Sequence, residues 1–141
     1  MHADDRVDEA VTPELASFLR TAVDDRPMVI AGSVCAACGG RAFALDFDEV
    51  EGVAARECHG CEARAFIADS AEFWEEADTG TAVCFTCDGE DFEVAVAFTM
   101  GDDGTVRWIT IGLRCTRDDT VDVFADWKID YAPTDHLLTM A

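Results

Sequence analysis

The chain has 141 residues, half of them apolar, which is enough for one domain with a buried core or for two very small domains. Its 30 acidic residues outnumber its 10 basic ones and give a net charge of −20. Such a surface repels the phosphates of nucleic acids and of anionic lipids, so we expect neither a nucleic acid nor a membrane as partner.

The beginning of the sequence indicates a compartment. The first ten residues, MHADDRVDEA, are acidic and lack the apolar core of a secretory signal. The sequence also has no apolar run of about 18 residues that could span a membrane. We therefore expect a cytoplasmic protein, in which paired cysteines bind metal more often than they form disulfides. The acidic excess favours solubility, and it also suits attraction to a basic protein partner.

The first predicted element is a helix that follows a flexible acidic tail over residues 1–11. Thr12 can cap this helix, and Pro13 stands at the first helical position, where proline is favoured. Apolar residues then recur at helical spacing and form one stripe, which we expect to pack on a sheet: Leu15, Phe18, Leu19, Ala22 and Val23.

The cysteines reveal an internal repeat. The segments CAACGGRAFAL, from residue 35, and CFTCDGEDFEV, from residue 84, both read C-x-x-C-x-G-x-x-F-x-apolar. The second halves match more weakly: CHGC leads to Phe66, and CTRD leads to Phe124. Each half therefore predicts a C-x-x-C turn, a strand, a returning strand, a second turn and a third strand. In the last turn, Asp118 stands where a partner for Cys115 is expected.

A short helix is predicted between the two units. Asp69 and Glu72 have capping-box spacing, and the helix continues to about residue 77. Its aromatic side chains, Phe73 and Trp74, are expected in the core.

The second unit contains a longer hairpin. Alternation over residues 92–98 predicts a half-buried strand, residues 101–104 predict a turn, and residues 109–113 form the return strand. Residues 132–141 are expected to be a loose tail. Before them, a further strand is predicted whose polar face is interrupted by Phe124 and whose apolar face carries Val121, Val123, Ala125, Trp127 and Ile129.

The first unit has the spacing of a zinc site. Its two C-x-x-C pairs are separated by residues 39–57, within the range of zinc signatures. Glycines follow the first and third pairs at positions 39, 40 and 89, where the chain turns through unusual dihedrals. Disulfides are the alternative on oxidation, whereas a thioredoxin-like redox motif lacks its helical context. We expect a structural Zn²⁺ ion with the ligands Cys35, Cys38, Cys58 and Cys61.

The second unit offers three cysteines and one remaining ligand position. The register of the repeat assigns that position to a carboxylate, which is an acceptable zinc ligand. Asp119, His136 and a water molecule are the alternatives, and a site without metal is another. We expect His59, inside a C-x-x-C pair, to be exposed. The predicted ligand set is Cys84, Cys87, Cys115 and Asp118.

With these motifs the chain resembles zinc ribbons of the rubredoxin-like class over residues 33–69 and 82–131. The resemblance implies a small, mainly β, metal-stabilised fold of two tandem antiparallel ribbons with a binding or scaffolding role. The first ribbon, with the N-terminal helix and the linking helix, then covers residues 12–78, and the second covers residues 79–131.

Three functions fit these observations. The first is a non-enzymatic module whose zinc ions are structural and whose acidic face binds a protein partner. The second is a redox or metal sensor that uses the three-cysteine site, and the third is a rubredoxin-like electron carrier with iron in the four-cysteine site. We do not expect an enzyme, because the sequence has no G-x-S-x-G, no glycine-rich phosphate loop and no H-E-x-x-H.

Overall fold

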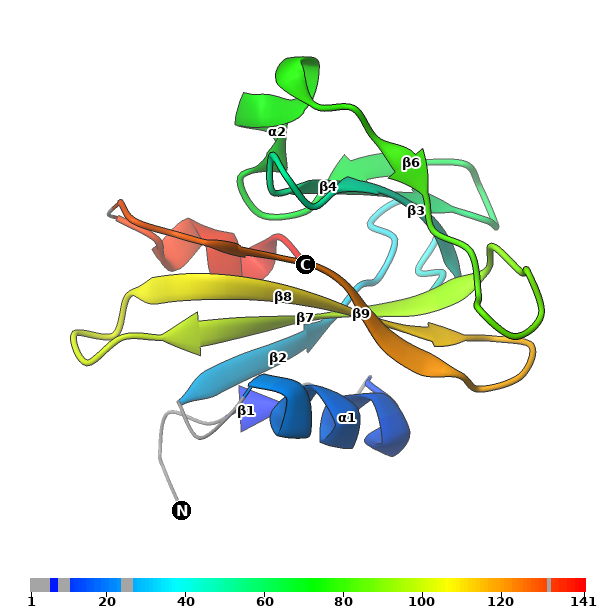
Figure 1. Ribbon diagram of the computed structural model, residues 1–141, viewed down its shortest axis with the longest axis horizontal. Helices are drawn as coiled ribbons and strands as arrows, with labels where there is room; N and C mark the ends of the chain where they lie inside the picture. The colour runs from blue at the N-terminus through cyan, green and yellow to red at the C-terminus, as the bar shows by residue number, and fades with distance from the viewer. Residues whose placement is uncertain (1–5, 8–10, 24–26, 132) are drawn as a thin grey trace.

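The computed structural model describes residues 6–7, 11–23, 27–131 and 133–141, and it is mainly β (Figure 1). A nine-stranded, mostly antiparallel sheet carries one long helix and one short helix. Among the described residues, no helix is long and apolar enough to cross a membrane. The helices are α1 (Pro13–Val23) and α2 (Ser70–Phe73), with 3-10 turns η1 (Trp74–Glu76) and η2 (Asp135–Thr139). The strands are β1 (Arg6–Val7), β2 (Met28–Gly32), β3 (Phe43–Asp48), β4 (Val53–Cys58), β5 (Arg64–Phe66), β6 (Gly80–Thr81), β7 (Phe92–Met100), β8 (Val106–Cys115) and β9 (Val121–Lys128).

The two repeat units are joined by an exchange of strands. Strands β3–β4–β5 form one antiparallel unit and β7–β8–β9 the other. However, β2, which precedes the first unit, pairs with β7, and β6, which precedes the second, pairs with β3. The two crossing strands make equivalent hydrogen bonds at their ends. Ser33 N–H donates to the Val94 carbonyl (2.9 Å), and Ala82 N–H donates to the Leu45 carbonyl (2.8 Å). The predicted boundary at residues 78/79 therefore does not separate two sheets.

Helix α1 begins at Pro13, as predicted, and packs on the face formed by β7, β8 and β9. Leu15 and Leu19 are fully buried, whereas Ala22, also assigned to the apolar stripe, is exposed. The helix approaches Gly112 so closely that a Cβ there would lie 2.8 Å from Leu19 Cδ2. The predicted tail is partly structured, since Arg6–Val7 form β1 beside β2; residues 1–5 and 8–10 lie outside the described residues.

Strands β7 and β9 differ from their predicted faces. Strand β7 is buried on both sides rather than half-buried, because α1 covers Ala95 and Ala97 while the main core covers the other face. In β9, Ile111 pairs with Ala125 and Gly112 with Val123, so Phe124 is an inserted residue without a partner. Because of this bulge, the apolar side chains before Phe124 and those after it point to opposite faces of the sheet. The predicted single apolar face is therefore wrong: Val121 and Val123 pack towards α1, and Trp127 and Ile129 enter the main core.

The linking helix is shorter than predicted and lies at the surface. It gives way to η1 after Phe73, whose side chain is 39 % exposed, and Trp74 is half-buried. The expected core position of these aromatics is therefore not observed for Phe73. Trp74 instead packs edge-on against Phe66 at the outer strand β5 (ring centroids 5.2 Å apart).

The end of the chain packs on the first unit rather than forming a loose tail. Within residues 133–141, turn η2 places Leu137 in the core with no exposed surface. Ala68 N–H donates to the Met140 carbonyl (2.8 Å), and Arg56 Nε donates to the Ala141 carbonyl (3.0 Å). The Thr134 hydroxyl, also buried, accepts a hydrogen bond from Val106 N–H (2.8 Å), and Leu138 and Ala141 pack against the core. These contacts order a segment that its terminal position alone predicts to be loose.

Candidate metal centres

All seven cysteines are free thiols, and the fold gathers them into two groups, one per unit. In the first group, Cys35 and Cys58 are buried in the main core, while Cys38 and Cys61 are exposed. The sulfurs of Cys35 and Cys61 are 3.5 Å apart, and those of Cys38 and Cys58 are 3.6 Å apart. The first unit therefore presents four thiols around one centre that is open on one side.

These separations fit a tetrahedral metal site. Four sulfurs at about 2.3 Å from a central Zn²⁺ ion lie about 3.8 Å from one another. A disulfide would instead bring two sulfurs to about 2.05 Å. The observed separations of 3.5 and 3.6 Å lie close to the first value, so the first group can hold a metal ion without rearrangement.

One backbone turn recurs four times and presents the ligands. In each turn the N–H of the leading cysteine donates to the carbonyl five residues on, and its own carbonyl accepts the N–H four residues on, at 2.8–3.0 Å. The residue at that fourth position has a left-handed φ of 60–76°. Only one of the four is glycine, and two are aspartates, which tolerate this region. The leading cysteines are Cys35, Cys58, Cys84 and Cys115, and the left-handed residues are Gly39, Glu62, Asp88 and Asp119.

The glycines after the cysteine pairs act in two different ways. Gly39 has φ +76°, the unusual dihedral predicted for this turn. Gly40 and Gly89 are needed for space instead, because a Cβ would lie 3.1 Å from Cys58 Sγ and 3.2 Å from Cys87 Sγ, respectively. The backbone can thus approach the sulfurs closely only without side chains at these two positions.

The second group contains Asp118 in the position that Cys61 has in the first. The carboxylate and the sulfurs of Cys84, Cys87 and Cys115 each offer one ligand atom, and these atoms lie within 4.8 Å of one another. Both Asp118 oxygens are 3.6 Å from Cys84 Sγ, and Cys87 Sγ is 3.5 Å from Cys115 Sγ. Tetrahedral ligands at about 2.3 Å for sulfur and about 2.0 Å for oxygen lie about 3.5 Å apart, so this geometry also fits a metal ion.

The other candidates for the fourth ligand point elsewhere. Asp119 accepts a hydrogen bond from Arg114 Nη1 at 2.6 Å, on the far side of the turn from the thiols. His136 is exposed in η2 and is not part of the group that surrounds these sulfurs. His59 is exposed, as expected, and its Nε2 lies 3.2 Å from the Glu90 carbonyl.

Thr86 and Thr120 hold the Asp118 carboxylate, and neither residue was predicted as part of the site. The hydroxyl of Thr86 donates to Asp118 Oδ2, and the backbone N–H of Thr120 donates to Oδ1 at 3.1 Å. These contacts lower the pKa of the Asp118 carboxyl. Ligating carboxylates are commonly oriented by such neighbours. Thr86 could have been singled out as the only hydroxyl between the paired cysteines, but its contact with residue 118 requires the fold.

The thiols of the first group differ in how readily they ionise. Backbone amides of Cys38 and Ala37 lower the pKa of Cys35 to about 6. The amide of Ala63 favours the Cys61 thiolate, but hydrogen bonds with the neighbouring thiols Cys35 and Cys38 outweigh it and raise the pKa of Cys61 to about 12. Similar opposing contacts raise the pKa of Cys38. Four close thiols without a cation cannot all be deprotonated, whereas a bound divalent ion would favour the thiolates.

The second group shows the same division. The hydroxyl and amide of Thr86 lower the pKa of Cys84 to about 7. Although the Gly89 amide favours its thiolate, burial and the thiols of Cys115 and Cys84 raise the pKa of Cys87 to about 11. In the first C-x-x-C pair of each unit, the leading cysteine therefore ionises before its partner.

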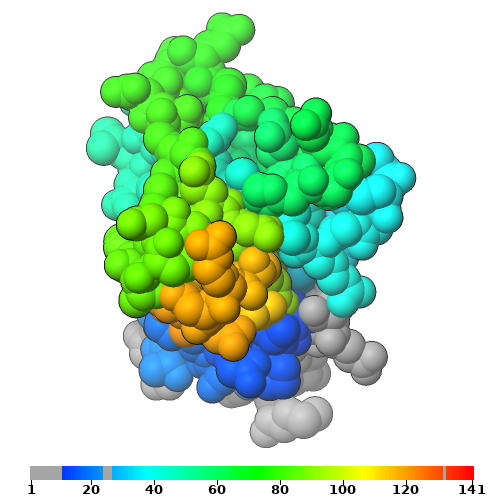
Figure 2. Space-filling view, turned by 90° about the vertical axis from the view of Figure 1, so that its right-hand side faces the viewer, coloured from blue at the N-terminus to red at the C-terminus, as the bar shows by residue number. Residues whose placement is uncertain are grey.

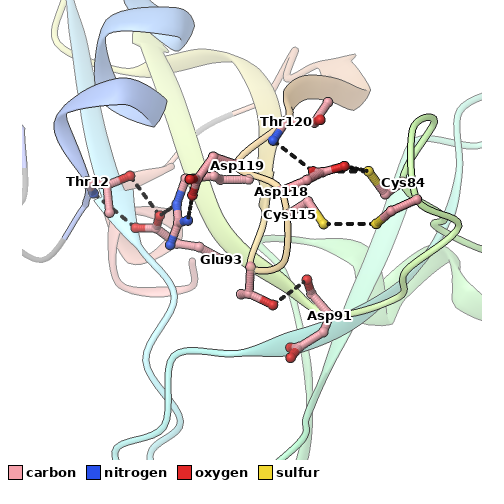
Figure 3. Close-up of polar contacts among 11 residues, drawn as sticks. Thr12, Cys84, Asp91, Glu93, Cys115, Asp118, Asp119 and Thr120 are labelled. Atoms are coloured by element: carbon pink, nitrogen blue, oxygen red, sulfur yellow. Dashed lines mark hydrogen bonds and ion pairs between the residues drawn. The ribbon is translucent and has the colours of Figure 1, made fainter.

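A network of charged hydrogen bonds ties the fourth turn to α1 (Figure 3). Glu93 on β7 accepts bonds from the N–H of Thr12 (3.0 Å), the Thr12 hydroxyl (2.8 Å) and Arg114 Nε (2.7 Å). Arg114 also binds Asp119, next to the candidate ligand. Thr12, expected to cap α1 with its side chain, thus directs that side chain to the sheet instead.

No known protein family, curated protein or solved structure is detectably similar to this chain. The two groups themselves are what the structure offers: four thiols in one, and three thiols with one carboxylate in the other. Both can bind a metal ion, and their donor sets suit a tetrahedral thiophilic metal.

Proposed function

We propose that the chain is a zinc-binding protein in which two structural Zn²⁺ ions hold a pair of ribbon-like units. The geometry of the first group carries this proposal: two of its sulfur–sulfur separations, 3.5 and 3.6 Å, are close to the edge length of the tetrahedron that Zn²⁺ requires, and all four sulfurs lie within 4.8 Å of one another. The second group has the same backbone turns and adds the carboxylate of Asp118.

A structural role is favoured over a catalytic one. A structural zinc site has four protein ligands, whereas a catalytic site keeps one position for water or substrate. Each group here offers four protein ligands, and the leading cysteine of each turn belongs to the main core. Metal binding in these groups would join the turns to the core, so its free energy would add to the free energy of folding.

We further propose that the protein acts as a cytoplasmic, non-enzymatic interaction module with a basic protein partner. The net charge of −20 supports this, because a strongly acidic surface speeds association with basic surfaces. Binding that weakens steeply between low and high salt would support the acidic surface as the contact. Binding that does not depend on ionic strength would contradict it.

Metal analysis tests the zinc proposal. Purified protein is expected to contain zinc, to be colourless, and to lose its folded near-ultraviolet circular dichroism when a strong chelator removes the metal. Red oxidised protein would instead indicate iron–thiolate centres and the electron carrier of the rubredoxin-like resemblance. A chelated chain that keeps its full dichroism and stability would show that the metals are not structural.

The second group supports one further candidate, a redox- or metal-responsive sensor. It contains only three thiols, and its carboxylate is already hydrogen-bonded by Thr86 and Thr120. A metal held by three thiolates and one carboxylate is easier to release than one held by four thiolates. Mild peroxide is therefore expected to release zinc from this site first. Simultaneous release from both sites would contradict the sensor.

A further inference from the structure

A shallow groove of about 470 Å³ lies directly beside the second metal group. It is formed where the turn that carries Cys84 and Phe85 meets the bulged start of β9 and the end of β3. In Figure 2 the segment 82–91 (green) and the β8–β9 turn (orange) lie side by side on the face towards the viewer. Its lining is Phe47, Glu49, Thr81, Ala82, Val83, Cys84, Phe85, Asp88, Val123 and Phe124.

Phe85 is the outstanding feature of this groove. Its side chain is 72 % exposed, yet it is held in place by stacking on Phe124, with ring centroids 5.4 Å apart and planes at 11°. Phe124 in turn is 8 % exposed and packs edge-on against Phe47 (5.8 Å). The groove wall is thus a continuous aromatic surface made of three contacting rings.

The repeat provides an internal control for Phe85. The equivalent position in the first unit is Ala36, between Cys35 and Cys38, and the backbone hydrogen bonds of that turn are the same. The turn therefore closes without an aromatic residue at this position. An exposed phenylalanine ring is unfavourable in water. Because only the second unit has one at this position, we infer that Phe85 serves binding and not folding.

The rim of the groove carries one sign of charge. Glu49 and Asp88 are exposed at its edge, and none of the described residues that line it is basic. An apolar floor with an acidic rim complements an apolar side chain flanked by lysine or arginine. The volume is sufficient for one or two such side chains, since ligand sites commonly measure about 300–1,000 Å³.

We propose that this groove binds a segment of a partner protein in which one or two apolar side chains are flanked by basic residues. This inference rests on the proposed interaction function and assigns it a surface. The second metal group shapes the groove, because Cys84 is part of its lining and Phe85 stands between Cys84 and Cys87. Removal of the metal from this group is therefore expected to weaken the binding.

The test is an NMR titration of the ¹⁵N-labelled, metal-loaded full chain. The probe is a blocked eight-residue peptide with two phenylalanines flanked by lysines, and its counterpart has glutamate in place of every lysine. We expect the basic peptide to shift the amide signals of Val83, Phe85 and Val123 and to bind less tightly as salt is added. Phe85→Ala is expected to weaken it at least about tenfold, as hot-spot aromatics do. Phe73→Ala, which removes an exposed phenylalanine outside the groove, should leave the affinity unchanged.

Several results would overturn the assignment. These are no shifts in the groove at millimolar peptide, equal binding of the acidic peptide, or equal affinity in Phe85→Ala. A concentration-dependent dimer of the free chain that Phe85→Ala abolishes would show that a second copy occupies the groove. Metal content measured on the same samples distinguishes a failure of the groove assignment from a failure of the proposed function. A chain with zinc that binds the peptide elsewhere refutes only the groove, and a chain with zinc that binds no basic peptide at all contradicts the proposed interaction function. A chain without zinc refutes the proposed zinc-binding function.

Discussion

Asp118 is the residue whose substitution tests the second site most closely. In the structure its carboxylate completes the group of three thiols, with both oxygens 3.6 Å from Cys84 Sγ. Asp118→Ala removes this ligand and leaves the position to water. Loss of an outer-shell partner alone weakens metal binding about 10–100-fold, so loss of the ligand itself should cost at least about 100-fold, or about 2.7 kcal/mol. Asp118→Cys restores the pattern of the first unit and should maintain or tighten binding.

Two further variants separate ligation from orientation. Thr86→Val removes the hydroxyl that donates to Asp118 but keeps the carboxylate, so it should weaken zinc binding less than Asp118→Ala does. Asp119→Asn changes the neighbouring carboxylate, which binds Arg114 and not the thiols, and should leave zinc affinity unchanged. Competition with a fluorescent chelator measures all four variants. Wild-type zinc affinity in Asp118→Ala would refute the assignment of this residue as a ligand.

Three other predictions test the thiols and the packing. Zinc affinity should rise with pH at both sites, because binding displaces protons from thiols whose pKa is raised. The rise should be steeper at the first site, which has two such thiols, than at the second, which has one. Equal slopes, or no slope, in competition titrations would contradict this. Leu137→Ala should lower the free energy of unfolding in urea by about 2–5 kcal/mol, because the Leu137 side chain is fully buried. Thr139 is exposed, so Thr139→Ala should change this free energy little. If the C-terminal segment were a loose tail, both substitutions would be neutral. Gly112→Ala should lower the free energy of unfolding by about 1–3 kcal/mol, since the added Cβ would press on Leu19. Gly80→Ala serves as the control, because a Cβ at this position meets open space. Equal urea midpoints of the two variants would show that α1 does not pack this closely.

The sequence predicts the local parts of this structure well. The start of α1 follows from Pro13 and the apolar stripe, and the strands of the second unit follow from their alternation. The register of the repeat correctly places Asp118 beside three cysteines, because C-x-x-C turns have nearly the same geometry wherever they occur.

The relations between distant segments were not predictable from these patterns. Strand exchange between the units depends on which sheet edge is free to pair with β2 and with β6. The local alternation of apolar and polar residues does not predict that pairing. The bulge at Phe124 reverses the alternation of β9, so the residue that interrupts the predicted polar face proves to be the point where the apolar side chains change faces. Likewise, the packing of residues 133–141 depends on the buried side chains of Leu137 and Thr134, and a prediction from terminal position does not detect such contacts.

Elemental analysis of the purified full chain tests the central claim most directly. The account predicts two zinc ions per chain, with the content of Asp118→Ala falling towards one after dialysis against a moderate chelator. A folded chain without bound metal would contradict it. So would a full set of disulfides in protein purified under reducing conditions.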